Sequence, residues 1–204
     1  EYVRVCQRSL NANAQLSSAL ASVNLATAFP SGNSLGDQLK VVARLIAARG
    51  ALGAKRHVFF VSIGGFDTHD SLLDTHPALM GRVGQALAAF HQATVELGVA
   101  EQVTAFTASD FGRTLVSNNG GSDHGWGSMH FVLGGSVKGA AFYGNAPVIA
   151  SGGPDDVGQG RLLPNVSVDQ YGATLASWLG VSNTDLASVL PNLGNYSTRN
   201  LGFV

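Results

Sequence analysis

Cysteine is almost absent from this sequence. Cys6 is the one cysteine among 204 residues, so a framework of intrachain disulfides and a thiolate metal cluster are both excluded. Charge is scarce as well, because charged residues make up only 12 %, about half the usual share for a soluble protein. The 12 basic residues nearly balance the 13 acidic ones, and the net charge is -1. The sequence therefore lacks the excess of basic residues with which proteins bind nucleic acids. We therefore expect no nucleic-acid partner.

Long hydrophobic runs and nucleotide-binding signatures are also missing. The longest strongly apolar run, residues 58–63, is far shorter than the roughly 20 residues of a membrane-spanning helix. We therefore expect no membrane span. Neither a Walker A motif nor Gly-x-Gly-x-x-Gly occurs, which argues against a phosphate cradle for nucleotides. Apolar residues, at 45 %, provide the material for a sizeable core.

Composition and periodicity suggest the domain organisation. Residues 1–34 are rich in Ser, Asn and Ala, so we predict a short helix and an N-terminal connecting segment. Residues 35–204 are predicted to form a single α/β domain. Its predicted strands are the apolar runs at residues 57–63, 103–108 and 130–133. The first run is apolar throughout, which is typical of a strand buried on both faces of a parallel sheet.

Helix signals lie between and after these strands. Apolar residues at helical spacing predict a helix from Leu35 that ends at Gly50, and Pro77 is well placed to begin a second one. Residues 167–170 have the form of a capping box, which predicts a third helix ended by Gly180. Strands that alternate with helices indicate an α/β layer structure with a parallel sheet.

Three loops beyond the predicted strand ends carry carboxylates and imidazoles. They are residues 64–70, 109–114 and 118–127. Functional groups collect on such loops in open parallel sheets, and carboxylate oxygens with imidazole nitrogens can hold a divalent metal. The chemistry that suits such a site is metal-assisted hydrolysis of an ester. The candidate ligands in these loops are Asp67, His69, Asp110 and His124.

Structural interpretations of the same residues stay open at this point. Asp67 has the position of a turn former or helix cap, and His124 in a glycine-rich loop packs about as often as it ligates. Asp74 and His76 lie where a helix begins, so we favour capping there. A serine triad of Ser122, His124 and a carboxylate is disfavoured, because neighbours in one loop rarely point at each other.

The three loops together resemble a known family. Their ordered motifs, with three later stretches, are similar to those of domain-of-unknown-function family 1501, and the resemblance covers roughly residues 58–181. This sulfatase-like family belongs to the alkaline phosphatase superfamily. The resemblance implies a doubly wound, mostly parallel α/β sheet with flanking helices, alkaline-phosphatase-like and incomplete in this chain. The motifs are residues 65–69, 109–114 and 121–126, followed by 160–164, 169–171 and 178–180.

The resemblance also implies a site. It makes Asp67, His69, Asp110 and His124 the metal ligands, with Asp123 a weaker fifth. The divalent metal would be zinc, manganese or calcium, and the substrate an anionic phosphate or sulfate ester. Arg113 would be an anion-binding catalytic group or would support a ligand, because a guanidinium can hold a tetrahedral oxyanion through two hydrogen bonds.

Three departures from the superfamily pattern affect these expectations. The spacing between Asp67 and His69 is shorter than the superfamily's commoner Asp-x-x-x-His. Phe111 follows Asp110 where many members have a histidine, so one nitrogen ligand is absent. The first metal ligand and the nucleophile of the superfamily lie in an N-terminal half. No early strand with such residues precedes Val58, so we expect that half to be missing from this chain. A partner chain or missing sequence would then complete the site. Family members often carry an export signal, which implies a periplasmic or extracellular protein.

Two hypotheses follow from the sequence. The first is a metal-dependent hydrolase of phosphate or sulfate esters, of which this chain is the carboxyl-terminal portion. The second is a non-catalytic binding or assembly protein that retains the fold and packs its low-charge surface against a partner. Phe111 at a ligand position favours the second hypothesis.

Overall fold

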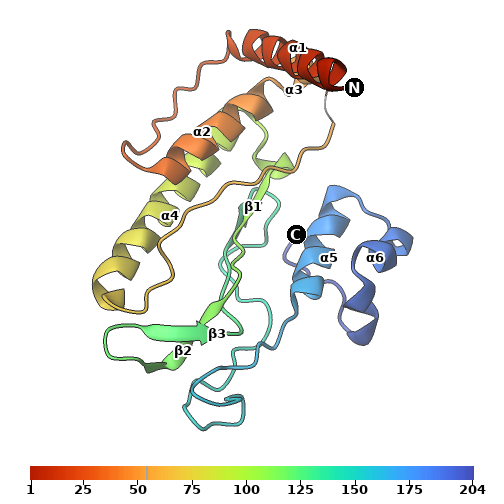
Figure 1. Ribbon diagram of the computed structural model, residues 1–204. Coiled ribbons are helices and arrows are strands. Elements are labelled where there is room, and N and C mark those ends of the chain that lie inside the picture. Colours follow the sequence, from red (N-terminus) through yellow and green to blue (C-terminus); the bar gives the residue numbers. More distant parts are fainter. Residues whose placement is uncertain (54) are drawn as a thin grey trace. The chain divides into compact units, whose positions relative to one another are not determined.

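The computed structural model describes residues 1–53 and 55–204, which form two compact units (Figure 1). Unit 1 comprises residues 1–64 and 79–100, and unit 2 comprises residues 65–78 and 101–204. The predicted boundary at residue 34 falls within unit 1 and stays a prediction. The helices and strands are α1 (Tyr2–Leu20), α2 (Ser34–Ala47), α3 (Arg49–Leu52), α4 (Leu72–Glu96), η1 (Ala100–Gln102), β1 (Thr104–Phe106), β2 (Gly112–Ser117), β3 (Ser122–Gly125), β4 (Val132–Gly134), α5 (Val168–Leu179), α6 (Asn183–Val189) and η2 (Pro191–Asn195).

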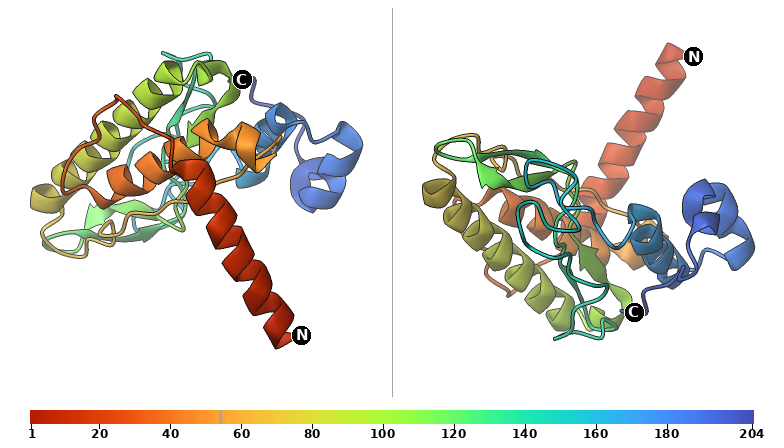
Figure 2. Two further views of the ribbon diagram at one scale, coloured as in Figure 1. Left: turned by 90° about the horizontal axis from the view of Figure 1, so that it is seen from above. Right: turned by 90° about the horizontal axis from the view of Figure 1, so that it is seen from below.

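The core of unit 1 lies between α2 and the second part of α4, which run side by side in Figures 1 and 2. Asn33 joins them: its side-chain oxygen accepts from the Gly36 N–H and caps α2, while its amide donates to the Arg82 carbonyl. The predicted helix from Leu35 is confirmed, but it ends at Ala47 and not at Gly50, which lies within α3. The apolar faces are buried at Leu35, Leu39, Val42, Ala43 and Ile46 of α2 and at Val83, Ala86, Phe90 and Ala93 of α4.

Two helices differ in extent from their predictions. The second helix begins at Leu72, five residues before Pro77, so the proline lies inside α4. The predicted short N-terminal helix is 19 residues long, and Figure 2 shows α1 as one unbroken helix. None of the residues of α1 is buried. Packing therefore contributes little to α1, whose polar and small residues gave only a weak periodic signal.

Unit 2 contains two small antiparallel sheets. β1 pairs with β4, with Ala105 opposite Leu133, and β2 pairs with β3 to form a hairpin. α5 begins with the predicted capping box at Ser167 and ends at Gly180, whose left-handed φ of 99° stops the helix. Behind it a small apolar cluster joins three elements: Ala173 of α5, Leu186 of α6 and Leu193 of η2 are buried together.

The predicted doubly wound, mostly parallel sheet is wrong. All strand pairs in the described residues are antiparallel, and each sheet there has two strands. β1 and β4 fall at two of the predicted strands, but residues 57–63 are not a strand. A strand buried on both faces needs neighbours at its edges and layers above and below it, and here Val58 and Phe60 are 76 % and 92 % exposed. The apolar run showed β propensity but not whether other strands are present to pair with it.

The absence of a membrane-spanning helix agrees with the sequence. Within the described parts of the chain, no helix combines the length and apolar character that crossing a bilayer requires.

Candidate metal centre

The β2–β3 hairpin provides the platform of the candidate site. Arg113 of β2 lies opposite His124 of β3, and residues directly opposite in an antiparallel pair project their side chains from the same face. The hairpin turn is formed by the polar and glycine-rich residues 118–121. Asn119 takes a left-handed φ of 88° there, a conformation that asparagine tolerates better than most residues.

The loop before α4 packs directly against this hairpin. The Thr68 carbonyl accepts from the Ser122 N–H at 3.4 Å, and the Leu72 N–H donates to the Gly120 carbonyl at 3.0 Å. A side chain at Gly121 would meet the backbone of Thr68 and His69, so only glycine permits this approach. These contacts bring Asp67 and His69 to the face that carries His124.

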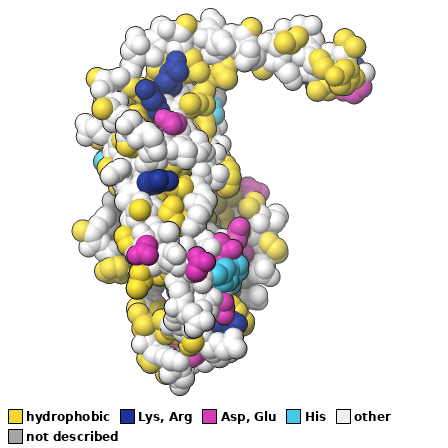
Figure 3. All heavy atoms as spheres, turned by 60° about the vertical axis from the view of Figure 1, so that its left-hand side comes forward, with side chains coloured by type: hydrophobic (Ala, Val, Ile, Leu, Met, Phe, Trp, Pro, Cys, Tyr) yellow, Lys and Arg dark blue, Asp and Glu magenta, His cyan; other side chains and the backbone are white. Residues whose placement is uncertain are grey.

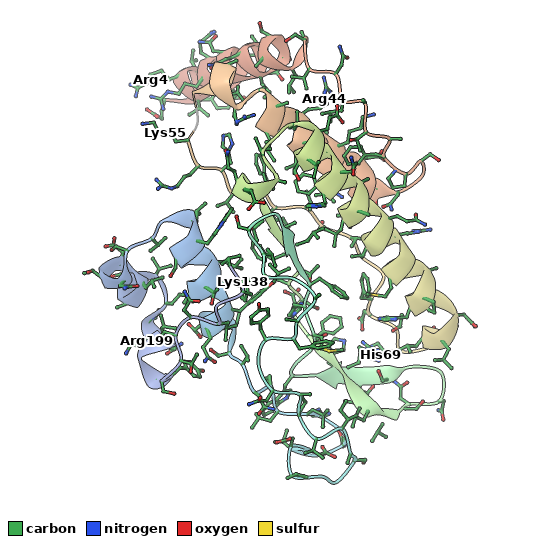
Figure 4. The ribbon with its side chains drawn as sticks, turned by 180° about the vertical axis from the view of Figure 1, so that it is seen from behind. Arg4, Arg44, Lys55, His69, Lys138 and Arg199 are labelled. Atoms are coloured by element: carbon green, nitrogen blue, oxygen red, sulfur yellow. The ribbon has the colours of Figure 1, made fainter. Side chains whose placement is uncertain are left out.

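Asp67, His69 and His124 form the candidate metal centre. The Oδ1 atom of Asp67 lies 2.8 Å from Nε2 of His124 and 2.9 Å from Nε2 of His69. One ligand atom from each of the three residues lies within 4.8 Å of the others. His69 is labelled beside the hairpin in Figure 4, and Figure 3 shows histidine and acidic side chains together at the surface.

The electrostatics of the cluster favour an ionised carboxylate. The hydrogen bond from His124 is the main cause that lowers the pKa of Asp67. Partial desolvation opposes this shift, while the Arg113 hydrogen bond and the positive potential of both imidazoles add to it. The Asp67 side chain is 57 % exposed, so the cluster is open to ions and small molecules from solvent.

The donor set fits a transition-metal ion better than calcium. Two imidazole nitrogens and one carboxylate oxygen are common ligands for zinc, and three protein ligands leave a position open for a substrate. Ligands at about 2.0–2.1 Å in a tetrahedron lie roughly 3.3 Å apart, so the 2.8 and 2.9 Å separations need only a small opening. Calcium takes about 6–8 oxygen ligands, which this set does not offer.

Arg113 ties the loop to the hairpin. Its Nε donates to the Ser122 hydroxyl at 3.1 Å and its Nη1 to Asp67 Oδ1 at 3.1 Å. Its Nη2 donates to the carbonyls of Thr68 and Ser122. These bonds use most of the five N–H donors of the guanidinium. Few donors remain to hold an anion through two hydrogen bonds, which is the role expected for Arg113 from the sequence. The side chain is 20 % exposed.

Aromatic rings cover His124. The Phe111 ring stacks on the His124 imidazole with centroids 3.9 Å apart and an interplanar angle of 2°. His69 stacks on His124 as well, at 5.2 Å and 29°. Phe111, which follows Asp110 in the sequence, therefore lies against a candidate ligand. No spacing in the sequence indicates this contact, because it depends on the hairpin register.

The other carboxylates of the predicted ligand set lie apart from the three ligand atoms. Asp110 is exposed, in the loop between β1 and β2, and does not belong to the cluster found among the described residues. Asp123 Oδ1 lies 3.4 Å from Nδ1 of His69, the ring nitrogen that does not face Asp67. Three of the four predicted ligands, Asp67, His69 and His124, therefore lie together. Asp123 lies next to His69, on the side of the ring away from Asp67.

Two other sequence features lie elsewhere. Residues 32–36 match the Gly-x-Ser-x-Gly pattern of a nucleophile elbow, but Ser34 is the first residue of α2 and follows a turn rather than a strand. His130, near β4, has its Nδ1 3.3 Å from the Thr107 hydroxyl, and partial burial lowers the pKa of His130. Neither residue joins the metal cluster that the described chain contains.

Comparison with known proteins gives one match. A family model described as "Protein of unknown function (DUF1501)" matches residues 1–189. No curated protein and no solved structure matches the chain.

Proposed function

We propose that this chain is a metal-dependent hydrolase of phosphate or sulfate esters. The chain belongs to the DUF1501 family of proteins of unknown function. The proposal rests on one observation: Asp67, His69 and His124 are exposed, and one potential ligand atom of each lies within 4.8 Å of the others. Two of these residues come from the loop before α4 and the third from β3, so the fold brings together ligands that are distant in sequence.

The chain's own residues have distinct roles in this proposal. Asp67, His69 and His124 hold a divalent cation, and the two nitrogen ligands favour zinc over calcium. The cation supplies a Lewis acid that polarises an ester oxygen. Arg113 keeps Asp67 ionised and directed at the two imidazoles. The choice of phosphate or sulfate esters, and of a periplasmic or extracellular location, comes from the resemblance of the loops to sulfatase-like proteins.

Hydrolysis of an aryl phosphate and an aryl sulfate tests the proposal. We expect activity that disappears on chelation and returns with zinc or manganese. Asp67→Asn should abolish it, because the variant loses the charged ligand. Asp37→Asn is the matched control: it removes one exposed carboxylate from the first turn of α2 and should leave activity unchanged. Activity that survives chelation, or no hydrolysis of either ester by the metal-loaded chain, would contradict the proposal.

A second candidate function is assembly with a partner chain. The observation that favours it is the exposure of large apolar side chains, with Phe60 and Phe142 both 92 % exposed and Met129 80 % exposed. Apolar side chains of this size lose contact with water when a partner covers them, which favours association. Sedimentation at several concentrations distinguishes the candidates: a 21.0 kDa species argues against self-assembly, and a larger complex without bound metal supports it over hydrolysis.

A further inference from the structure

We propose that Asp123 is a positioning residue that fixes the ring of His69, rather than a fifth metal ligand. This inference rests on the proposed function, because it concerns how one of the proposed ligands is held. It replaces the sequence-based expectation that all carboxylates of these loops converge on the metal.

The two nitrogens of His69 have different partners. Nε2 lies 2.9 Å from Oδ1 of Asp67, within the cluster, while Nδ1 lies 3.4 Å from Oδ1 of Asp123. A metal-ligating imidazole offers one nitrogen to the cation and almost always donates the N–H of the other to a carboxylate, a carbonyl or water. Asp123 occupies the acceptor position of that arrangement.

The hairpin turn holds the Asp123 carboxylate in place. The side-chain N–H of Asn118 donates to Asp123 Oδ1 at 2.9 Å. The side-chain oxygen of Asn118, Oδ1, accepts from the Gly121 N–H at 3.2 Å. The Asn118 backbone N–H donates to the Gly121 carbonyl at 3.1 Å, which closes the turn. Asn118 is therefore fixed at two points besides its contact with the carboxylate.

The backbone of Asp123 is fixed from the other strand. Its N–H donates to the Thr114 hydroxyl at 3.2 Å, and Thr114 is buried in β2. The amide of Asn118 also lies 3.4 Å from Nδ1 of His69. The Asn118 amide and the His69 ring thus both face Oδ1 of Asp123, at 2.9 and 3.4 Å. A cation bound to Nε2 would place the ring proton of His69 on Nδ1, where the Asp123 carboxylate lies 3.4 Å away.

A purely structural role for Asp123 makes a different prediction. If Asp123 only stabilised the turn, its replacement would lower the stability of the hairpin but leave the affinity of the folded protein for zinc unchanged. The test must therefore measure zinc binding and the state of the His69 ring on protein that is shown to be folded.

Zinc titration calorimetry on the full chain is the first arm of the test. We expect Asp123→Asn to weaken zinc binding about 10- to 100-fold, the usual effect of removing a group that orients a ligand. Asn118→Ala keeps the carboxylate but frees it, and should weaken binding by less. Asp74→Asn, which removes an exposed carboxylate from the first turn of α4, should bind zinc as the unmodified chain does.

The second arm uses the imidazole signals of the zinc-loaded protein in nuclear magnetic resonance. We expect a slowly exchanging Nδ1–H proton on His69 that is lost in Asp123→Asn. Unchanged zinc affinity and an unchanged proton signal in folded Asp123→Asn would overturn the positioning role while leaving the metal site intact. If the unmodified chain binds no zinc, the proposed function itself fails, which is a separate result.

Discussion

At the scale of single residues, His69 and His124 both direct Nε2 at the same oxygen of Asp67, yet the surroundings of their rings differ. The Asp123 carboxylate lies next to Nδ1 of His69, whereas the ring of Phe111 stacks on His124. A histidine on an exposed hairpin is otherwise free to turn about its side-chain bonds. Stacking on one face restricts that motion and keeps the nitrogen directed at the cluster.

Replacement of Phe111 tests this stacking. We expect Phe111→Leu to weaken zinc binding by up to about tenfold, because an aromatic pair is worth about 0.5–1.5 kcal/mol beyond its buried area. Phe111→Tyr keeps a flat ring and should bind zinc nearly as well as the unmodified chain. Calorimetric titration of both variants measures the difference. Equal affinities for the leucine and tyrosine variants would show that the ring does not orient His124.

At the scale of elements, local signals in the sequence predicted structure well and long-range pairing poorly. α5 could be predicted because its capping box and Gly180 lie within one short segment. The β2–β3 hairpin was missed because the turn at residues 118–121 was interpreted as a loop between parallel strands. At residues 57–63 a strand was predicted and none is present. The β propensity of a short apolar run does not show whether partner strands exist.

The same reasoning explains which site residues could be identified. Asp67, His69 and His124 stood out as ligand types in neighbouring loops, and the fold brings them together. The roles of Phe111 and Asp123 depend on the hairpin register and on the turn at Asn118. No spacing in the sequence states either of these.

The cap of α5 offers a test at this scale. The Ser167 hydroxyl accepts from the Gln170 N–H at 3.1 Å, and the Gln170 side chain accepts from the Ser167 N–H at 3.0 Å. We expect Ser167→Ala to lower the free energy of unfolding by about 1 kcal/mol, the typical cost of losing an N-cap. Ser167→Thr should lose much less. Urea unfolding followed by circular dichroism measures both, and equal loss in the two variants would argue against the cap.

Glu96 of α4 links pH to the stability of unit 1. Its carboxylate accepts from the backbone N–H groups of Ala26 and Thr27 at 2.7 and 2.8 Å and from the Thr27 hydroxyl at 2.6 Å. The hydrogen bond from the Thr27 side chain is the first cause that lowers the pKa of Glu96 from its ordinary value of 4.5. A lowered pKa in the folded state means that this stabilisation is present above 4.5 and is lost as the pH falls through the folded-state pKa.

Comparison of the unmodified chain with Glu96→Gln tests this linkage. We expect the variant to be less stable at neutral pH, because its amide cannot reproduce the charged acceptor. The difference should vanish in acid well below the ordinary glutamate value, where the carboxylate of the unmodified chain is protonated. Thermal unfolding measured across this range gives the result. A difference that stays constant with pH would contradict the role of the ionised carboxylate.

At the scale of the whole molecule, the proposed metal centre belongs to unit 2. This unit contributes all three proposed ligands together with Arg113, Phe111 and Asp123. Loss of metal should therefore affect the loop before α4 and the hairpin more than the core of unit 1. Hydrogen exchange before and after chelation measures this, and we expect faster exchange at Ser122 and Leu72, whose N–H groups join the loop to the hairpin. Equal changes in α2 would argue against a centre confined to unit 2.

Metal content is the most direct test of the central claim that Asp67, His69 and His124 form a metal site. Plasma mass spectrometry of the chain, purified without chelator and then supplied with zinc or manganese, should find close to one divalent ion per chain. The double variant His69→Ala and His124→Ala should lose that ion, whereas His91→Gln, outside the cluster on α4, should keep it. A chain that takes up no metal, or a double variant that retains it, would contradict the claim.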